Sequence, residues 1–215
     1  MANTPLTRLA VLISGTGTTL QNLIEHIRSG NLAAQIVLVV SSRAEVLGVE
    51  RARQAQLPLA IIERRGCSAA DFARRVWDTI RAADPHLICM AGWLHLLPIP
   101  PEYRYRVLNI HPALLPAFGG KGMYGRRVHE AVLAAGVKVS GCTVHFADDS
   151  YDTGPIILQK CVPVLDNDTA ETLAARVFAA ECWAYPEAIR RVATGRFRLD
   201  GRRVLFSLDG ETAQT

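Results

Sequence analysis

Apolar residues along this chain form short continuous runs that alternate with segments of helical spacing. The first five runs occupy residues 8–14, 35–41, 57–63, 85–92 and 106–110. Continuous hydrophobicity of this kind is typical of strands that are buried on both faces of a parallel sheet. Because helical segments separate the runs, the pattern predicts an α/β fold: an open, mostly parallel twisted sheet with helices on both faces, a Rossmann-like arrangement.

The helical segments have an apolar face and recognisable ends. In the first segment, that face is formed by Leu20, Leu23, Ile24 and Ile27. Gly30 follows, where a helix C-terminus favours glycine. Ser68 with Asp71 is a capping pattern that opens a helix reaching Ala83. Two further helices are predicted, over about 45–55 and 126–135.

The C-terminal part of the pattern differs from the rest. Two apolar runs, 137–146 and 154–165, are joined by a short loop and predict an antiparallel addition to the sheet. Asp168 and Glu171 are expected to cap a last long helix, which Pro186 should bend.

Length and composition fit one domain with a sizeable core. The 215 residues are 49% hydrophobic and 20% charged, as in an ordinary folded protein. We expect a single domain over 1–215 with its core at about 8–193. In the tail, residues 194–215, the Asp-Gly turn of LDGRR predicts a small hairpin.

Bulk features also narrow the cellular setting and the partners. No run reaches the ~18 apolar residues of a membrane helix, and MANTPLTR lacks the features of a signal peptide. Five cysteines form an odd, widely spaced set, which favours free thiols in the cytoplasm. The net charge is +4 and the arginines are scattered, so nucleic-acid binding is not expected, whereas a small anionic substrate fits.

Ligands of open sheets bind beyond the carboxyl ends of the strands, so the loops after the first and fifth strands are candidate sites. After the first strand, Gly15 and Gly17 allow a sharp turn, and Thr18 or Thr19 opens the helix. Free amides at a helix N-terminus favour an anion such as phosphate. Leu20 stands where a GxGxxG fingerprint needs its third glycine. The segment predicts a site for a small phosphate ester, with a ligand-free glycine turn as the alternative.

The fifth strand ends in VLNIHP and is followed by an irregular, glycine-rich stretch. Asn109 and His111 share one face at the strand period of two. An amide donor beside an imidazole can stabilise a developing oxyanion. Loops of this length inside a compact domain are uncommon and often functional. We therefore predict a catalytic pair here, with a hydrogen-bonded structural histidine as the alternative.

A third polar group lies in HFADDSYDTGPII, ahead of a Gly-Pro turn. Asp148 and Asp149 are expected to be solvated or to bond their own backbone. Asp152 is expected to lie against His111 and to raise the pKa of the imidazole, so that the ring acts as an acid near neutrality. His145 is expected to line the strand beneath the site. His111, His145 and Asp152 could instead bind a metal, which no HxH, HExxH or Cys/His cluster supports.

Five segments resemble those of the glycinamide ribonucleotide formyltransferases, a folate-dependent family of purine biosynthesis. They are LISGTGTTLQNLI, ICMAGWLHLL, VLNIHPALLPAF, GCTVHFADDSYDTGPIILQKCVPV and ECWAYP, in the family's order over about 8–190. The Asn-x-His-Pro and Asp-x-Gly-Pro segments mark the wider group that uses 10-formyltetrahydrofolate. The resemblance implies formyl transfer from 10-formyltetrahydrofolate, as co-substrate, to the amine of glycinamide ribonucleotide. It implies no metal and no tightly bound cofactor, and it leaves monomer and homodimer open.

The resemblance also implies roles for particular residues. The catalytic set would be Asn109, His111 and Asp152. The ribonucleotide would be bound by Gly17, Thr18, Thr19, Leu20 and Glu181. The folate would lie among Leu94, His95, Leu96, Leu97, Asn109, Asp148 and Asp152. In this mechanism Asn109 and His111 stabilise the oxyanion of a tetrahedral intermediate, and Asp152 assists proton transfer.

Three features depart from the family's pattern. GTGTT places hydroxyls where relatives often have amides, and His95 stands where arginine is frequent. The stretch AFGGKGMYGRRVHEA is longer than the usual loop. We expect the loop 117–125 to close over the substrates. Lys121 in it is either an additional phosphate contact or part of a flexible surface tip.

Other functions stay open at this point. A formyltetrahydrofolate deformylase would use the same residues with water as the nucleophile, but it carries an N-terminal regulatory domain, whereas the first strand here begins by residue 8. A methionyl-tRNA formyltransferase needs a C-terminal RNA-binding domain, and the segment after Leu199 is too short for one. A non-catalytic phosphate-binding module explains SGTGTT but leaves Asn109, His111 and Asp152 unexplained.

Overall fold

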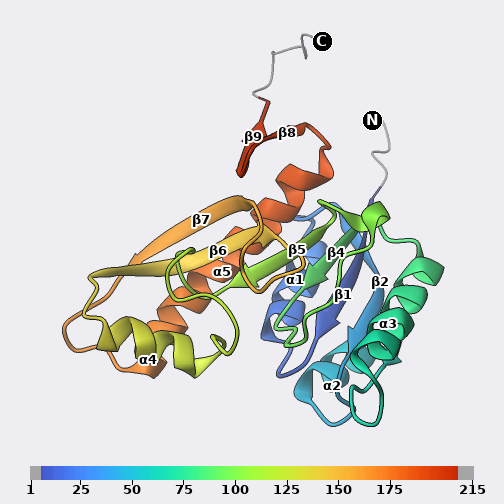
Figure 1. Ribbon diagram of the computed structural model, residues 1–215, viewed down its shortest axis with the longest axis horizontal. Helices are drawn as coiled ribbons and strands as arrows, with labels where there is room; N and C mark the ends of the chain where they lie inside the picture. Colours follow the sequence, from blue (N-terminus) through green and yellow to red (C-terminus); the bar gives the residue numbers. More distant parts are fainter. Residues whose placement is uncertain (1–5, 208–215) are drawn as a thin grey trace.

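Nine strands form one mixed sheet in the computed structural model, which describes residues 6–207 (Figure 1). The strands are β1 (Thr7–Ile13), β2 (Ala34–Ser41), β3 (Leu59–Ile61), β4 (Leu87–Met90), β5 (Val107–His111), β6 (Val139–Phe146), β7 (Ile156–Pro163), β8 (Phe197–Asp200) and β9 (Arg203–Phe206). Their order across the sheet is β3-β2-β1-β4-β5-β6-β7-β9-β8. The helices are α1 (Thr18–Arg28), α2 (Leu47–Gln54), α3 (Ala69–Ala83), α4 (Arg126–Ala134), α5 (Ala170–Ala193) and the short 3-10 helix η1 (Pro101–Tyr103).

The pairing of the strands confirms the predicted fold class. β1 to β5 are parallel to one another. β6 is antiparallel to β5 and β7 is antiparallel to β6, as the C-terminal pattern predicted. β3 is shorter than the predicted 57–63, because only its central residues pair with β2.

Alternate residues of the central strands bury themselves on opposite faces of the sheet. On β1, Leu9 and Val11 pack with α1 and α5, whereas Ala10 and Leu12 pack with α3. Figure 1 shows α3 on one side of the sheet and α1 and α5 on the other. Burial on both faces explains why the sequence of these strands is hydrophobic without interruption.

Side chains cap the N-termini of α3 and α5, and the predicted cap of α5 is corrected. Ser68 caps α3 by accepting a hydrogen bond from the amide of Asp71, as predicted. α5 is capped by Thr169, whose side chain accepts from the Thr172 amide, and not by Asp168 or Glu171. Asp168 stands one position too early for the cap; its carboxylate accepts from the Leu165 amide instead.

α5 continues through Pro186, which lies inside it. A proline lacks an N–H and leaves the carbonyl four residues earlier without its helical partner. Here that carbonyl belongs to Cys182, and the side chain of Asn22 on α1 donates to it at 3.0 Å. The Tyr185 hydroxyl, fully buried, lies within hydrogen-bond distance of the carbonyls of Met90 and Leu108. α5 is thereby fixed against the carboxyl ends of β4 and β5.

The predicted C-terminal hairpin is present as β8 and β9, whose antiparallel strands turn at Gly201 and Arg202. β9 also joins the main sheet beside β7, which the sequence pattern did not predict. Residues 208–215 of the predicted tail lie outside the described residues.

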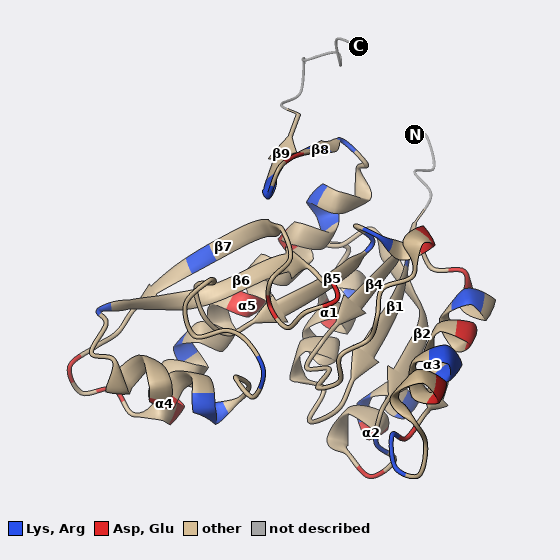
Figure 2. Ribbon diagram, viewed as in Figure 1, with Lys and Arg blue, Asp and Glu red and all other residues tan. Residues whose placement is uncertain are grey.

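Three expectations drawn from composition can be compared with the structure. All five cysteines are free thiols, as predicted. Over residues 6–207, no helix is both long and apolar enough to cross a membrane. Lys and Arg residues are spread over α3, α4, β7 and the end of α5 and are not gathered on one element (Figure 2).

Candidate active site

A cavity of about 910 Å³ opens at the carboxyl ends of β1, β4 and β5. The strand order reverses at β1 and β4, where the chain passes from one half of the sheet to the other, and such switch points are where ligands bind in open sheets. The loops after β1 and β5 line the cavity, as predicted, together with the segment after β4.

The cavity brings together the residues predicted for the site, with one exception. Its lining includes Gly17, Thr18, Thr19, Leu94, His95, Leu96, Leu97, Asn109, His111, Asp148, Asp152 and Glu181. Leu20 does not line it, because its side chain points into the core beneath α1 and is fully buried. A helix turns by about a third of a circle per residue, so Leu20 faces the sheet when Thr18 faces the cavity.

The loop after β1 brings its backbone close to that of α2. Gly17 has a left-handed φ of 69°, and a Cβ there would lie 2.5 Å from the Cα of Gly48 on α2. Arg51 on the same helix donates through Nε to the carbonyl of Thr16 at 3.0 Å. α1 has no side-chain cap and no acidic residue in its first turn. Its first amides are therefore available to an anionic ligand in the cavity.

Asn109 is oriented by its neighbours on the paired strand and the following loop. His145 lies opposite it across β5 and β6, and the Nδ1 of His145 donates to the carbonyl of Phe146 at 2.8 Å. The Nε2 of His145 is therefore an acceptor, and the Asn109 amide donates to it at 3.1 Å. The Asn109 amide also donates to Oδ1 of Asp152 over a longer 3.4 Å. His145 thus has a structural part in the site, positioning an amide donor.

His111 is 3% exposed and has an oxygen atom near each ring nitrogen. Its Nε2 donates to the carbonyl of Phe118 at 2.8 Å, since a carbonyl can only accept. Its Nδ1 lies 3.5 Å from Oδ2 of Asp152, as the sequence predicted for these two residues. The same carboxylate oxygen accepts from the Gly120 amide at 2.9 Å.

The pKa values of this pair correct one expectation. Burial lowers the pKa of His111 below its ordinary value, and the opposing effects of Asp152 and the Phe118 carbonyl do not outweigh it. The prediction of an imidazole that is charged near neutrality is therefore wrong for the empty site. Burial acts to raise the pKa of Asp152, but its contacts with His145, His111 and the Gly120 amide bring it below the usual range. The resting pair is a carboxylate beside a neutral imidazole.

The loop 148–154 is tied to the segment after β4. Asp148 accepts from the Ser150 amide and the Thr153 hydroxyl, in agreement with the prediction for this residue. Asp149 is exposed, in agreement with the prediction that it is solvated, and it also accepts from the Ile99 amide at 2.9 Å. The Tyr151 hydroxyl accepts from the Leu96 amide at 3.2 Å. These bonds hold the loop and residues 94–97 as the two sides of one pocket.

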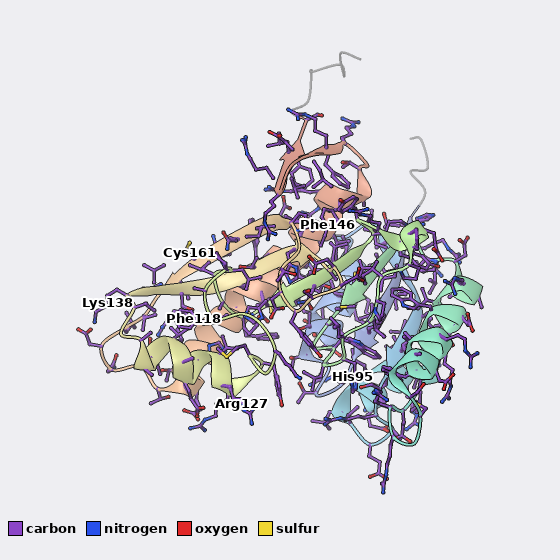
Figure 3. All side chains as sticks on the ribbon, viewed as in Figure 1. His95, Phe118, Arg127, Lys138, Phe146 and Cys161 are labelled. Atoms are coloured by element: carbon purple, nitrogen blue, oxygen red, sulfur yellow. The ribbon has the colours of Figure 1, made fainter. Side chains whose placement is uncertain are left out.

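The irregular stretch after His111 reaches back to His111 and Asp152. Phe118, labelled in Figure 3, supplies the carbonyl on His111, and Gly120 supplies the amide on Asp152. A Cβ at Gly119 would lie 2.4 Å from Leu115 and 3.3 Å from Asp152, so a larger residue would push the loop away. Lys121 lines the cavity and has no hydrogen bond or ion pair within residues 6–207.

On the helices α4 and α5, two ionisable side chains of the cavity wall combine a shifted pKa with no hydrogen-bond partner in the described part of the chain. Glu181 on α5 is one, and burial raises its pKa to about 8. His129 on α4 is the other; it is 4% exposed, and burial with the neighbouring His111 lowers its pKa. Sequence reasoning missed His129. The signal was a histidine between Val128 and Val132 on the otherwise apolar face of a helix.

His95, which stands in place of the arginine expected from relatives, packs edge-on against the rings of Phe72 and Trp93. Burial lowers its pKa, and the nearby Arg64 and Arg43 act in the same direction. His95 is thus a mostly neutral ring on the wall of the cavity (Figure 3). Among residues 6–207, no three His, Cys, Asp or Glu side chains are grouped so that they could hold a metal ion.

Comparisons with known proteins give one consistent result. Residues 7–189 match the model of the formyl transferase family. The chain is 40% identical to the chloroplastic phosphoribosylglycinamide formyltransferase of Vigna unguiculata, over 90% of this chain and 64% of that protein. It is 42% identical to the trifunctional purine biosynthetic protein adenosine-3 of Bos taurus, over 89% of this chain and 19% of that protein. The chain therefore spans less than two thirds of the length of these curated relatives.

Solved structures agree in fold over nearly the whole chain. Glycinamide ribonucleotide transformylase 1 of Symbiobacterium toebii aligns with a TM-score of 0.86 and 41% identity, over 94% of both chains. A formyltetrahydrofolate deformylase from Pseudomonas syringae aligns with a TM-score of 0.82 but 21% identity, over 94% of this chain and 66% of that one. The second likeness concerns the fold alone.

Proposed function

This chain belongs to the formyl transferase family, and from that premise we propose that it transfers the formyl group of 10-formyltetrahydrofolate to the amine of glycinamide ribonucleotide in purine biosynthesis. The observation that carries the proposal is the convergence of Asn109, His111 and Asp152 in one cavity with the glycine turn after β1. A non-catalytic phosphate-binding module would need only the turn.

The ribonucleotide is proposed to bind between the first loop and α5. Its phosphate would accept from the backbone amides at Gly17, Thr18 and Thr19, where the helix N-terminus favours an anion. Glu181 lines the same cavity without a partner among the described residues. A buried carboxyl group that lacks a partner is unfavourable in the empty protein. We therefore assign Glu181 to the amine-bearing glycinamide part, which supplies donors for it.

The folate is proposed to lie between residues 94–97 and the loop 148–152. Two hydrogen bonds hold these segments at a fixed spacing. They run from the Leu96 amide to the Tyr151 hydroxyl and from the Ile99 amide to the Asp149 carboxylate. The walls are largely apolar, with Leu94, Leu96 and Leu97 in the lining. A flat heteroaromatic ring fits such walls, and Asn109 and Asp152 at the inner end would face its formyl group.

The reaction follows from the resting state of these groups. The substrate amine attacks the formyl carbon, and the formyl oxygen becomes an oxyanion. An N–H of Asn109, which makes only the long 3.4 Å bond to Asp152, is available to this oxygen. The lone pair of His111 Nδ1 accepts the proton that the amine loses, and Asp152 at 3.5 Å stabilises the imidazolium that forms. The bond from carbon to N10 of the folate then breaks, and N10 takes up a proton.

The accompanying proposals concern cofactors and setting. The co-substrate is 10-formyltetrahydrofolate, and no metal or tightly bound cofactor takes part in the steps above. Scattered Lys and Arg residues support small-molecule substrates and no nucleic-acid partner (Figure 2). Free thiols at all five cysteines support a cytoplasmic site of action.

One assay separates this reaction from its nearest rival. The purified protein is supplied with 10-formyltetrahydrofolate, with and without glycinamide ribonucleotide, and the release of tetrahydrofolate is followed. Release that depends on the ribonucleotide supports the transferase. Release without it indicates a hydrolase of the deformylase kind, and no release under either condition indicates a binding protein. The last two outcomes contradict the proposal.

A further inference from the structure

The C-terminal hairpin of β8 and β9 lies beyond β7 (Figure 1) and contacts the loop that carries Asp152. β9 pairs with β7 at Ile156 and Arg203, just after this loop. The guanidinium of Arg202, at the hairpin turn, donates to the carbonyl of Thr153, the residue that follows Asp152. Neither arginine lines the cavity, so the hairpin acts on the loop from outside the substrate site.

Aromatic side chains give the hairpin a second attachment to the same region. Phe197 on β8 stacks on Phe146 (labelled in Figure 3) at the end of β6, with ring centroids 5.4 Å apart. Phe206 on β9 lies 6.0 Å from Phe197. The Phe146 backbone in turn meets the end of the loop. Its amide donates to the carbonyl of Pro155 at 2.9 Å, and a Cβ at Gly154 would lie 1.8 Å from its carbonyl oxygen.

The loop needs support, because Asp152 has a left-handed backbone with a φ of 59°. A residue with a Cβ is strained in this conformation and keeps it only where surrounding contacts impose it. Before Asp152, the bonds of Asp149 and Tyr151 supply such contacts. After it, the carbonyl of Thr153 is held by Arg202.

We propose that the hairpin is a positioning element for the transfer reaction, with Arg202 as its positioning residue. By holding the Thr153 carbonyl, Arg202 keeps the Asp152 carboxylate in place against His111 and the Gly120 amide. This inference rests on the proposed function, in which Asp152 assists proton transfer. A small displacement of that carboxylate would slow the chemical step without weakening the binding of the ribonucleotide phosphate, which lies at the other loop.

The kinetic test compares Arg202→Ala with a matched control, Arg203→Ala. The control loses the same charge from the same hairpin, but its side chain pairs with Asp200 and not with the loop. For Arg202→Ala we expect kcat to fall about three- to tenfold, the net effect of losing one ordinary hydrogen bond, with the KM for glycinamide ribonucleotide unchanged. Arg202→Lys should restore part of the loss. Equal kcat values for the two alanine variants would overturn the proposal, as would a loss that tracks a fall in Tm.

A second measurement does not depend on activity. The Gly120 amide donates to Oδ2 of Asp152, so its hydrogen exchange reports the position of the carboxylate. We expect faster exchange at Gly120 in Arg202→Ala than in the wild type, and no change in Arg203→Ala. If the wild type lacks transferase activity while Gly120 responds in this way, the proposed function fails and the positioning role stands. If Gly120 exchanges alike in all three proteins, the positioning role is wrong even in an active enzyme.

Discussion

Nδ1 of His111 lies 3.5 Å from Oδ2 of Asp152, although the irregular stretch after β5, the helix α4 and the strand β6 separate the two residues in the chain. Burial lowers the pKa of the imidazole, and Asp152 opposes this effect. The contact therefore does not produce a charged histidine in the empty site. It provides a place where a proton gained during the reaction is stabilised, which is a property of a base that becomes an acid later in the same cycle.

His111→Ala removes the proposed proton acceptor and leaves the phosphate loop intact. We expect kcat to fall by about a hundredfold or more, the usual effect of losing one group that stabilises a developing charge. Binding of glycinamide ribonucleotide, measured by titration calorimetry, should change little because His111 is not near the amides of α1. Turnover at the wild-type rate would remove the histidine from the mechanism.

Asp152→Asn tests the electrostatic part of the pair. The carboxylate raises the pKa of His111 against the effect of burial, so its neutral replacement should lower that pKa further. NMR titration of the imidazole Cε1–H in the two proteins measures the shift directly. His86 is the internal control, because it lies just before β4, at the opposite end of the parallel strands from Asp152, and its Nδ1 accepts from the Arg8 amide. An unchanged or higher pKa for His111 in the variant would contradict the assigned geometry.

Much of the fold could be predicted because its signals are local. The five buried strands are continuously hydrophobic since both faces of the sheet are covered, and the Ser68 cap needs only the following turn. Asn109 and His111 are two residues apart on one strand, so the strand period alone places both at one edge of the sheet.

The rest depends on contacts between distant segments. The carbonyl of Phe118 on His111 comes from a loop without a repeating pattern, and no spacing rule indicates it. The sign of the pKa shift at His111 was missed because burial is a tertiary property that the pairing with Asp152 does not reveal. The place of β9 beside β7 rests on one residue pair and on the stacking of Phe197 on Phe146.

Glu181→Gln tests whether the fold keeps a destabilising carboxyl group for function. Burial raises the pKa of Glu181 from its ordinary value of 4.5 to about 8. Between these pH values the folded protein holds a proton that the unfolded chain has released, so the free energy of unfolding falls as pH rises through this window. Glu181→Gln has no titrating group at this position, so its free energy of unfolding does not fall in this window for that reason. We expect its Tm to exceed that of the wild type at pH 8 and to match it near pH 4.

The same variant should bind the ribonucleotide more weakly, because an amide cannot accept as strongly from the substrate's donors as a carboxylate can. Tm by scanning calorimetry and Kd by titration calorimetry provide the two readings. A variant with the same pH dependence of Tm as the wild type would show that the carboxyl group of Glu181 is solvated and ionised in the folded protein.

Lys121→Ala decides between the two interpretations of the long loop. Lys121 lines the cavity and has no ion pair within residues 6–207, so its charge is free to meet a phosphate. Lys138→Ala is the matched control: this lysine lies at the far end of β6 and pairs with Asp166 at 2.8 Å (Figure 3).

If Lys121 contacts the phosphate, its removal should raise the KM for glycinamide ribonucleotide by about tenfold, the value of one hydrogen bond to a charged group, and leave the KM for the folate unchanged. The rise should shrink at high salt, because screening weakens the contact in the wild type. Equal KM values for the two variants would instead place Lys121 on a surface tip that plays no part in binding.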